Sequence, residues 1–406
     1  MAVIRPFRAV RPDADSALAV SSVPYDVVST EEARALASDN PLSFLHVTRS
    51  EIDLPADTDP YAPDVYAKAA ANFTALRARA PLVTEADPSL YLYRLRMGAH
   101  EQTGVAGCFS VDEYERDVIK KHERTRRDKE DDRTRHIIEL RAQTGVVFLT
   151  YKTSPDVAGI TTSVAAGAPL YDFIAPDGVQ HTIWKTDARQ SAELMDVFSR
   201  IPALYIADGH HRAASAARAR AELRKRGDAG ESDTFIAVAF PDDQMLILPY
   251  NRIVKDLAGN TPDGFLSALR EGGIPVQDGR PDPPARRHVS MYLAGKWYDL
   301  DLSEAHPAER SRAAALDVAR LQQHVLEPLL GIGDVRVDKR IDFIGGARGA
   351  SALEAAVDEG RAAVAFAMYP VAIDDLISIS DEGGIMPPKS TWFEPKLRDG
   401  LLIHVI

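Results

Sequence analysis

Cysteine is almost absent from this sequence of 406 residues, in which Cys108 is the single one. An intrachain disulfide is therefore excluded, and a reducing compartment is expected. Cys108 also lies in an apolar run, 105–109, far along the chain from the polar segment 208–212. We therefore expect a buried core residue rather than a nucleophilic thiol beside a bound phosphate.

Positive charge is also scarce, because 48 Lys and Arg stand against 60 Asp and Glu, for a formal net charge of −12. This balance argues against nucleic-acid binding as the main function. Apolar runs such as 362–369 are too short to cross a membrane, and the first residues lack the apolar core of a signal peptide. We expect a cytoplasmic protein with a small-molecule substrate and with neither nucleic acid nor membrane as partner. The oligomeric state is left open.

Two common nucleotide-binding signatures, the Walker A sequence and a complete Rossmann fingerprint, are missing, and no internal repeat is visible. The remaining composition, 45% hydrophobic and 27% charged, is that of an ordinary globular protein. Its length suits two domains. We predict a mixed α/β or α+β fold, with a catalytic core over 1–255 and an α/β domain over 256–406. We expect that the final loop of the second domain, 383–398, can return to the functional site of the catalytic core.

Hydrophobic periodicity predicts the elements along the chain. Helices are expected over 30–36, 66–79, 110–142, 188–199, 261–271, 313–330 and 351–359. Strands are expected over 90–97, 105–109, 146–151, 203–207, 234–240, 245–248, 341–344 and 362–368, with hairpins over 173–184 and 290–300. The segment 159–169 is predicted as loop or partial strand. The charged helix 110–142 is interpreted mainly as a solvated helix held by ion pairs.

The most informative segment joins a strand to a helix. An apolar run, 203–207, ends at Asp208 and Gly209, and an alanine-rich helical pattern then begins at once and continues to Arg226. Asp208 is expected to cap this helix. Gly209 allows the backbone to turn sharply and to approach a ligand closely.

Three phosphate-competent side chains follow in the first helical turn: His210, His211 and Arg212. Backbone N–H groups and the helix dipole favour an anion at this position, and a guanidinium suits phosphate. Successive helical residues diverge by about 100°, so both histidines are not expected on one metal ion. One should face the phosphates and the other the interior. The alternative is an ordinary turn with solvated polar residues.

Two further segments have an anion-binding composition. A glycine turn, 345–349, can cradle a phosphate, although a lone glycine turn is more often an ordinary one. The loop 383–396 is stiffened by prolines and carries two cations, Lys389 and Lys396, and two hydroxyls, Ser390 and Thr391. The alternative for this loop is a surface tail.

The string Asp208–Arg212 resembles the phosphate-gripping motif of the ParB/sulfiredoxin-like superfamily. That superfamily includes nucleotidases, sulfiredoxins and small-molecule kinases that phosphorylate free serine. Other segments resemble one family of large bacterial and archaeal proteins catalogued as a domain of unknown function. These segments are 23–27, 121–125, 131–133, 386–391 and 393–396. The resemblance implies a ParB/sulfiredoxin-like phosphate-binding core, with an additional C-terminal part.

The same resemblance suggests which residues contact the acceptor. The acceptor pocket would include Tyr25, Asp26, Lys121, Thr125 and Arg133. In the segment 121–125, the carboxylate that aligns or deprotonates the acceptor hydroxyl would be Glu123, with Asp26 or Asp132 as the next candidates. We expect Glu123 to lie across a cleft from the turn at Asp208.

Phosphoryl transfer needs neutralised phosphates, a metal ion and an aligned hydroxyl. The turn residues Gly209, His210, His211 and Arg212 would hold the phosphates, and Asp208 would orient the turn or a magnesium-bound water. Lys389 and Lys396 would close over the nucleotide or anchor a substrate carboxylate, and Ser390 and Thr391 would also contact the nucleotide. The sequence favours a kinase that uses ATP or ADP with magnesium and acts on a small hydroxyl metabolite. The resemblance to the superfamily implies free L-serine as the acceptor, and hence a role in serine metabolism. The alternatives are a nucleotide phosphohydrolase and a non-catalytic nucleotide-binding switch of the ParB type.

Overall fold

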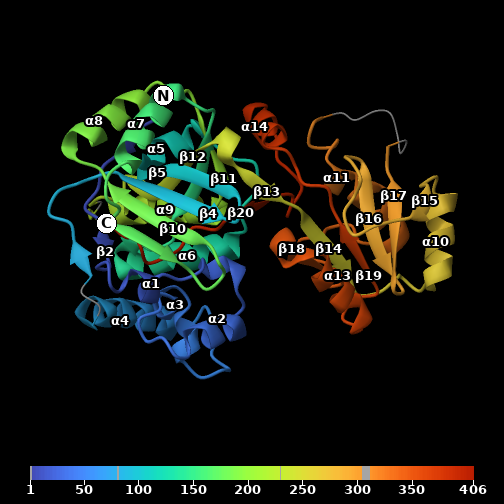
Figure 1. The fold of residues 1–406 in the computed structure, drawn as a ribbon. Helices are drawn as coiled ribbons and strands as arrows, with labels where there is room; N and C mark the ends of the chain where they lie inside the picture. Colours follow the sequence, from blue (N-terminus) through green and yellow to red (C-terminus); the bar gives the residue numbers. More distant parts are fainter. Residues whose placement is uncertain (1, 80–81, 229, 304–310) are drawn as a thin grey trace. The chain divides into compact units, whose positions relative to one another are not determined.

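The computed structural model describes residues 2–79, 82–228, 230–303 and 311–406. The chain divides into two compact units with a mixed α/β fold, as predicted (Figure 1). The first unit comprises residues 1–121, 125–245 and 395–406, and the second comprises 122–124 and 246–394. The second unit thus begins at Leu246 rather than at residue 256, because the strands after this point pair within it.

The first unit is built on a nine-stranded mixed sheet, with strand order β6-β11-β8-β12-β5-β4-β10-β9 and β1 paired to β5. The pairs β6/β11 and β8/β12 are parallel. The strands are β1 (Ile4–Arg5), β4 (Tyr91–Met97), β5 (His100–Ser110), β6 (Ile119–Lys120), β8 (Val147–Tyr151), β9 (Tyr171–Ile174), β10 (Gln180–Lys185), β11 (Leu204–Asp208) and β12 (Thr234–Pro241). Two small antiparallel pairs join β2 (Val10–Arg11) to β3 (Val83–Thr84) and β7 (Ala142–Gln143) to β21 (His404–Val405).

Helices surround this sheet (Figure 1). They are α1 (Ala17–Val20), α2 (Thr30–Ala37), α3 (Leu45–Thr48), α4 (Pro63–Arg79), α5 (Val111–Glu115), α6 (Arg127–Leu140), α7 (Pro155–Ala165), α8 (Ala188–Phe198) and α9 (His210–Lys225). Short 3₁₀ turns are η1 (Tyr25–Val27), η2 (Ser50–Asp53) and η3 (Asp242–Gln244). Among the described residues, no helix combines the length and the apolar character that a membrane crossing requires.

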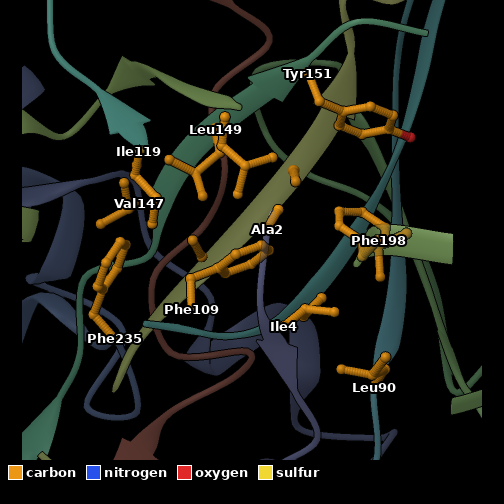
Figure 2. Packing of buried hydrophobic residues seen from close by; sticks show 14 of the residues in the cluster. Ala2, Ile4, Leu90, Phe109, Ile119, Val147, Leu149, Tyr151, Phe198 and Phe235 are labelled. Atoms are coloured by element: carbon orange, nitrogen blue, oxygen red, sulfur yellow. The ribbon is translucent and has the colours of Figure 1, made fainter. Parts of the chain in front are cut away.

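Aliphatic and aromatic side chains pack together in the core of the first unit, as Figure 2 shows. The ring of Phe109 on β5 lies 6.4 Å from that of Phe198 on α8 and 6.5 Å from that of Phe235 on β12. Each fully buried side chain of this size contributes about 1.5–3 kcal/mol to folding. Cys108, beside Phe109, is buried as predicted. The core therefore fixes β5, β8, β11 and β12 in one rigid layer.

The second unit contains a six-stranded antiparallel sheet with the order β15-β17-β16-β19-β14-β18. Its strands are β14 (Tyr250–Val254), β15 (Val276–Asp278), β16 (His288–Leu293), β17 (Lys296–Asp301), β18 (Ile341–Gly345) and β19 (Val364–Ala367). A separate antiparallel pair joins β13 (Leu246–Leu248) to β20 (Trp392–Glu394). The helices are α10 (Pro262–Glu271), α11 (Asp317–Leu321), α12 (Glu327–Leu330), α13 (Gly349–Asp358) and α14 (Ile373–Asp381), with a 3₁₀ turn η5 (Gly346–Arg348).

The predicted long charged helix over 110–142 is wrong. It is interrupted after α5, where Asp117 has a positive φ of 56°, and the chain then forms β6. Ile119 pairs with Leu204 of β11, so a tertiary strand pairing overrides the local helical pattern. The helix resumes only at Arg127.

Three other element predictions need correction. The segment 159–169, predicted as loop or strand, lies largely in α7, which begins with Pro155 at its first turn. Hydroxyls of Thr161 and Thr162 donate to the Ala158 carbonyl, which accommodates these residues in a helix. The helix expected over 313–330 contains a π-helical turn at 322–326 directly before Pro328, which cannot donate a helical hydrogen bond. The strand expected at 105 already begins at residue 100.

Candidate functional site

The strand-to-helix junction predicted at 208–212 is present in the first unit. Asp208 is the last residue of β11, Gly209 has a φ of 98°, and α9 begins at His210. The prediction that Asp208 caps the helix is wrong, because Gly209 occupies the N-cap position. The carboxylate of Asp208 instead contacts two cations, Arg212 and Lys396.

Arg212 connects this junction to a second carboxylate. Its Nη2 lies 3.1 Å from Oδ2 of Asp26 and 3.5 Å from Oδ2 of Asp208, and its Nη1 donates to the Val146 carbonyl. The Arg212 side chain is only 6% exposed, whereas those of Asp26 and Asp208 are 35% and 29% exposed. Despite its burial, the two carboxylates raise the pKa of Arg212. The buried Arg212 guanidinium therefore forms ion pairs with two carboxylates that are partly exposed to solvent.

Lys396 completes the ion-pair network from the other end of the chain. Its Nζ donates to Oδ2 of Asp208 at 3.1 Å. Burial alone would raise the pKa of Asp208, but Lys396 and Arg212 outweigh that effect and hold it well below its usual range. Asp208 is therefore ionised at neutral pH. We call Asp26, Asp208, Arg212 and Lys396 the junction network.

Two of the predicted acceptor residues lie beside this network. The Arg133 guanidinium lies 4.2 Å from the centre of the Tyr25 ring and pairs with Asp132 at 2.9 Å. Tyr25, Arg133 and Arg212 line one small cavity of about 30 Å³, which is room for about two water molecules. Arg212 Nε has no hydrogen-bond partner among the described residues. Tyr25, Asp26 and Arg133 thus lie close to the junction, and their role in acceptor binding stays a prediction.

Other predicted residues have contacts elsewhere in the first unit. Lys121 pairs with Asp117 and lies 4.4 Å from the centre of the Tyr114 ring. Thr125 donates to Glu130 on α6. These contacts direct both side chains toward neighbouring helices, so their role in acceptor binding stays a prediction.

The two histidines of the junction differ in burial. His210 is buried, whereas His211 is half-buried. The Nε2 of His211 accepts a hydrogen bond of 2.9 Å from the backbone N–H of Arg126. This bond requires an unprotonated Nε2, so it favours the neutral imidazole. The expected divergence of the two side chains is consistent with these different surroundings.

Four predicted site residues belong to the second unit: Glu123, Lys389, Ser390 and Thr391. Glu123 is half-buried, and its place opposite Asp208 stays a prediction. Ser390 donates to the Pro387 carbonyl at 2.6 Å. This bond closes the turn that carries Lys389, so this part of the loop is ordered by its own contacts.

The sequence analysis did not identify Asp399, a residue of the first unit. It is 2% exposed, and its backbone exchanges two hydrogen bonds with Ser22, of 2.9 and 3.1 Å. Its Oδ2 has no partner in the described ranges. Burial raises the pKa of Asp399 to about 7, and Arg212 opposes this shift while Asp26 adds to it. The available signal was an Arg-Asp-Gly string just before the apolar run 401–403.

Residues 4–319 match the profile of a family described as protein of unknown function, DUF1015. The match spans well over half of the chain. The chain belongs to the DUF1015 family. The matched region includes the junction at 208–212 but ends before Lys396 and Asp399. A comparison with curated proteins finds no match, and the ParB/sulfiredoxin-like resemblance stays a prediction.

Three solved structures are similar over 74% of this chain. A conserved hypothetical protein from Pyrococcus furiosus is 13% identical, with 95% of its chain covered and a TM-score of 0.37. C-terminally truncated SbnI from Staphylococcus aureus is 13% identical, with 87% covered and a TM-score of 0.39. A free serine kinase in complex with AMP is 12% identical, with 91% covered and a TM-score of 0.35. Similarity at this level assigns no ligand or residue role to this chain.

Proposed function

We propose that the chain is a nucleotide-dependent phosphotransferase that moves a phosphoryl group from ATP or ADP to the hydroxyl of a small metabolite. The observation that carries this proposal is the junction network, in which Arg212 and Lys396 share Asp208 at the start of α9. Free L-serine is the first acceptor to test, a choice that rests on the resemblance of the 208–212 motif alone. A cytoplasmic location would suit this reaction.

The phosphate side of the proposal rests on the start of α9. This 16-residue helix places its positive dipole end at Gly209. A glycine at this point lets phosphate oxygens approach the backbone. Lys396 and Arg212 add positive charge beside it, and His210 and His211 complete the proposed grip. Residues 389–391 would supply further contacts to the nucleotide.

Magnesium fits the carboxylate of Asp208. This group is ionised and 29% exposed, and a carboxylate oxygen is a ligand that magnesium prefers, directly or through water. When bound, magnesium would neutralise charge on the phosphates. Arg212 and Lys396 would then keep the Asp208 oxygens in a fixed orientation.

Transfer requires one bond to form and one to break. The acceptor hydroxyl oxygen bonds to the terminal phosphorus, while the bond from that phosphorus to the nucleotide's bridging oxygen breaks. The hydroxyl proton passes to a carboxylate, for which Glu123 is the first candidate and Asp26 the second. Tyr25 and Arg133 would line the acceptor pocket, together with Lys121 and Thr125.

The test is a transfer assay with ATP or ADP, magnesium and a panel of hydroxy amino acids, with ³¹P NMR detection of the product. Asp208→Asn should lower acceptor-dependent turnover at least about 100-fold. Asp228→Asn, which changes an exposed carboxylate paired with Arg141, should leave turnover unchanged. Nucleotide consumption that is independent of any acceptor would indicate a phosphohydrolase instead. Nucleotide binding without turnover would indicate a switch and would overturn the proposal.

A second set of variants tests the proton acceptor. Glu123→Gln should lower turnover by about 10²–10⁴ while nucleotide affinity is retained. If Glu123→Gln is fully active, Asp26→Asn and Asp132→Asn are the next variants. His210→Ala and His211→Ala test the histidine pair. Replacing the histidine that faces the phosphates should lower turnover, and replacing the other should mainly lower the stability of the fold.

A further inference from the structure

A buried arginine in the second unit has no carboxylate partner among the residues that the structure describes. Arg252 lies in the middle of β14 and is 3% exposed. Its Nη2 donates to the Lys389 carbonyl at 3.0 Å, and its Nη1 donates to the Tyr250 carbonyl. Across the described ranges, no Asp or Glu forms an ion pair with it. A buried charge of this kind is costly unless an opposite charge compensates it.

A second cation lies on the same side of the sheet. Tyr250 and Arg252 are two residues apart on β14, so their side chains share one face. The Nζ of Lys389 lies 5.1 Å from the centre of the Tyr250 ring. Lys389 also has a positive φ of 57°, which is uncommon for a residue with a side chain. The hydrogen bond from Arg252 to the Lys389 carbonyl helps to fix this backbone conformation. The positions of the two residues are therefore coupled.

Aromatic rings frame the two cations. The Trp392 ring lies 5.1 Å from the Tyr250 ring, and the Phe343 ring lies 5.6 Å from the Arg252 guanidinium. A Cβ on Gly345 would lie 2.7 Å from the Trp392 ring, so only glycine permits this packing. Close packing thus accounts for Gly345 without the phosphate cradle that the sequence suggested.

We propose that Arg252 and Lys389 form a phosphate-binding site on this face of the second unit, with Tyr250 and Trp392 as its walls. The two hydrogen bonds of the guanidinium use two of its five N–H donors, and the remaining donors can bind oxygens of an anion. Two cations match the charge of a phosphate dianion. Burial lowers the pKa of Arg252, and a bound dianion would reverse that shift.

The phosphate can be free or part of a nucleotide. The nucleotide case rests on the proposed function, since residues 389–391 are predicted nucleotide contacts there. The free-phosphate case does not. Both share the same chemistry, so the site is defined by the phosphate group alone.

The test is a fluorescence titration of the full chain at constant ionic strength with inorganic phosphate, pyrophosphate or ATP. The sequence has three tryptophans, and Trp392→Phe identifies the signal of Trp392. Wild type should give a saturable change that disappears in Trp392→Phe. Arg252→Met should weaken binding about tenfold or more. Arg336→Met, which changes an exposed arginine of the same unit, should leave the affinity unchanged.

Two results would overturn the inference: a wild-type signal that does not saturate with any of the three ligands, or unchanged phosphate affinity in Arg252→Met. If Arg252→Met does not fold, Arg252→Lys and Lys389→Met replace it, and unchanged affinity in both overturns the inference. Saturation by phosphate and pyrophosphate identifies a free-phosphate site, whereas saturation by ATP alone identifies a nucleotide site. Asp208→Asn separates the two proposals, because it should lower acceptor-dependent turnover at least about 100-fold and retain this fluorescence signal.

Discussion

Lys396 donates a hydrogen bond of 3.1 Å to Oδ2 of Asp208, across 188 positions of the sequence. The same oxygen lies 3.5 Å from Arg212 Nη2. The carboxylate therefore lies between two cations, one from the start of α9 and one from the final segment of the first unit. The final segment, 395–406, is thus part of the candidate site and not an appendage to the second unit.

We predict that Lys396→Met lowers phosphoryl transfer about 10–100-fold, the scale of one lost charge-assisted hydrogen bond. Without Lys396, Asp208 loses the stronger of the two cations that hold its pKa low. The activity loss should therefore be larger at acidic pH than at pH 8. Steady-state kinetics over pH 5–8 measures this, with Lys225→Met, an exposed lysine on α9, as control. An unchanged pH profile would contradict the assignment.

Local sequence signals were sufficient to predict the strand-to-helix junction at 208–212. An apolar run followed by Asp-Gly and an alanine-rich pattern specifies a strand, a turn and a helix through nearest neighbours alone. The cap was misassigned because Asp208 has a partner far away in sequence, Lys396. Its contact with that lysine is a tertiary feature that local preference does not contain.

Burial was the property that the sequence analysis could not supply. Arg212 was expected to reach a phosphate directly, yet it is buried against the Val146 carbonyl. Asp399 was missed because its burial depends on the backbone pairing with Ser22. The break at Asp117 likewise follows from the pairing of β6 with β11, which outweighs the helical preference of the charged residues.

Arg212 should contribute to stability as well as to ligand binding. The sequence predicts that Arg212→Ala weakens nucleotide binding by about 1.5–3 kcal/mol without unfolding. The structure also predicts a loss of folding stability for variants of Arg212. A lysine at this position keeps the charge but cannot contact Asp26, Asp208 and the Val146 carbonyl together. We expect Arg212→Lys to lower the free energy of unfolding by about 1.5–3 kcal/mol in urea titrations.

A double-mutant cycle with Asp26→Asn tests the same contact. The two substitutions should be non-additive by about 0.5–3 kcal/mol, because they remove one shared interaction. Arg218→Lys, on the same helix with partly exposed partners, should cost no more than about 1 kcal/mol. Strict additivity of Arg212→Lys and Asp26→Asn would show that the ion pair contributes nothing.

Cys108 should be unreactive in the folded protein. It is buried in β5, and burial raises the pKa of its thiol, so the reactive thiolate is scarce. A disulfide reagent should label no thiol in native buffer and one thiol in urea. Rapid labelling in native buffer would show that this strand opens readily.

Asp399 should make the protein less stable as pH rises. Its pKa is raised by burial to about 7 in the folded chain, against about 3.9 when unfolded. Between these values the folded state holds a proton that the unfolded state releases, so stability falls as pH rises through this window. Asp399→Asn removes the ionisation and should therefore gain stability relative to wild type between pH 5 and pH 8. Urea titrations at both pH values measure the difference, with the exposed Asp228→Asn as control. A difference between Asp399→Asn and wild type that does not change with pH would show that Asp399 is ionised in the folded state throughout this range.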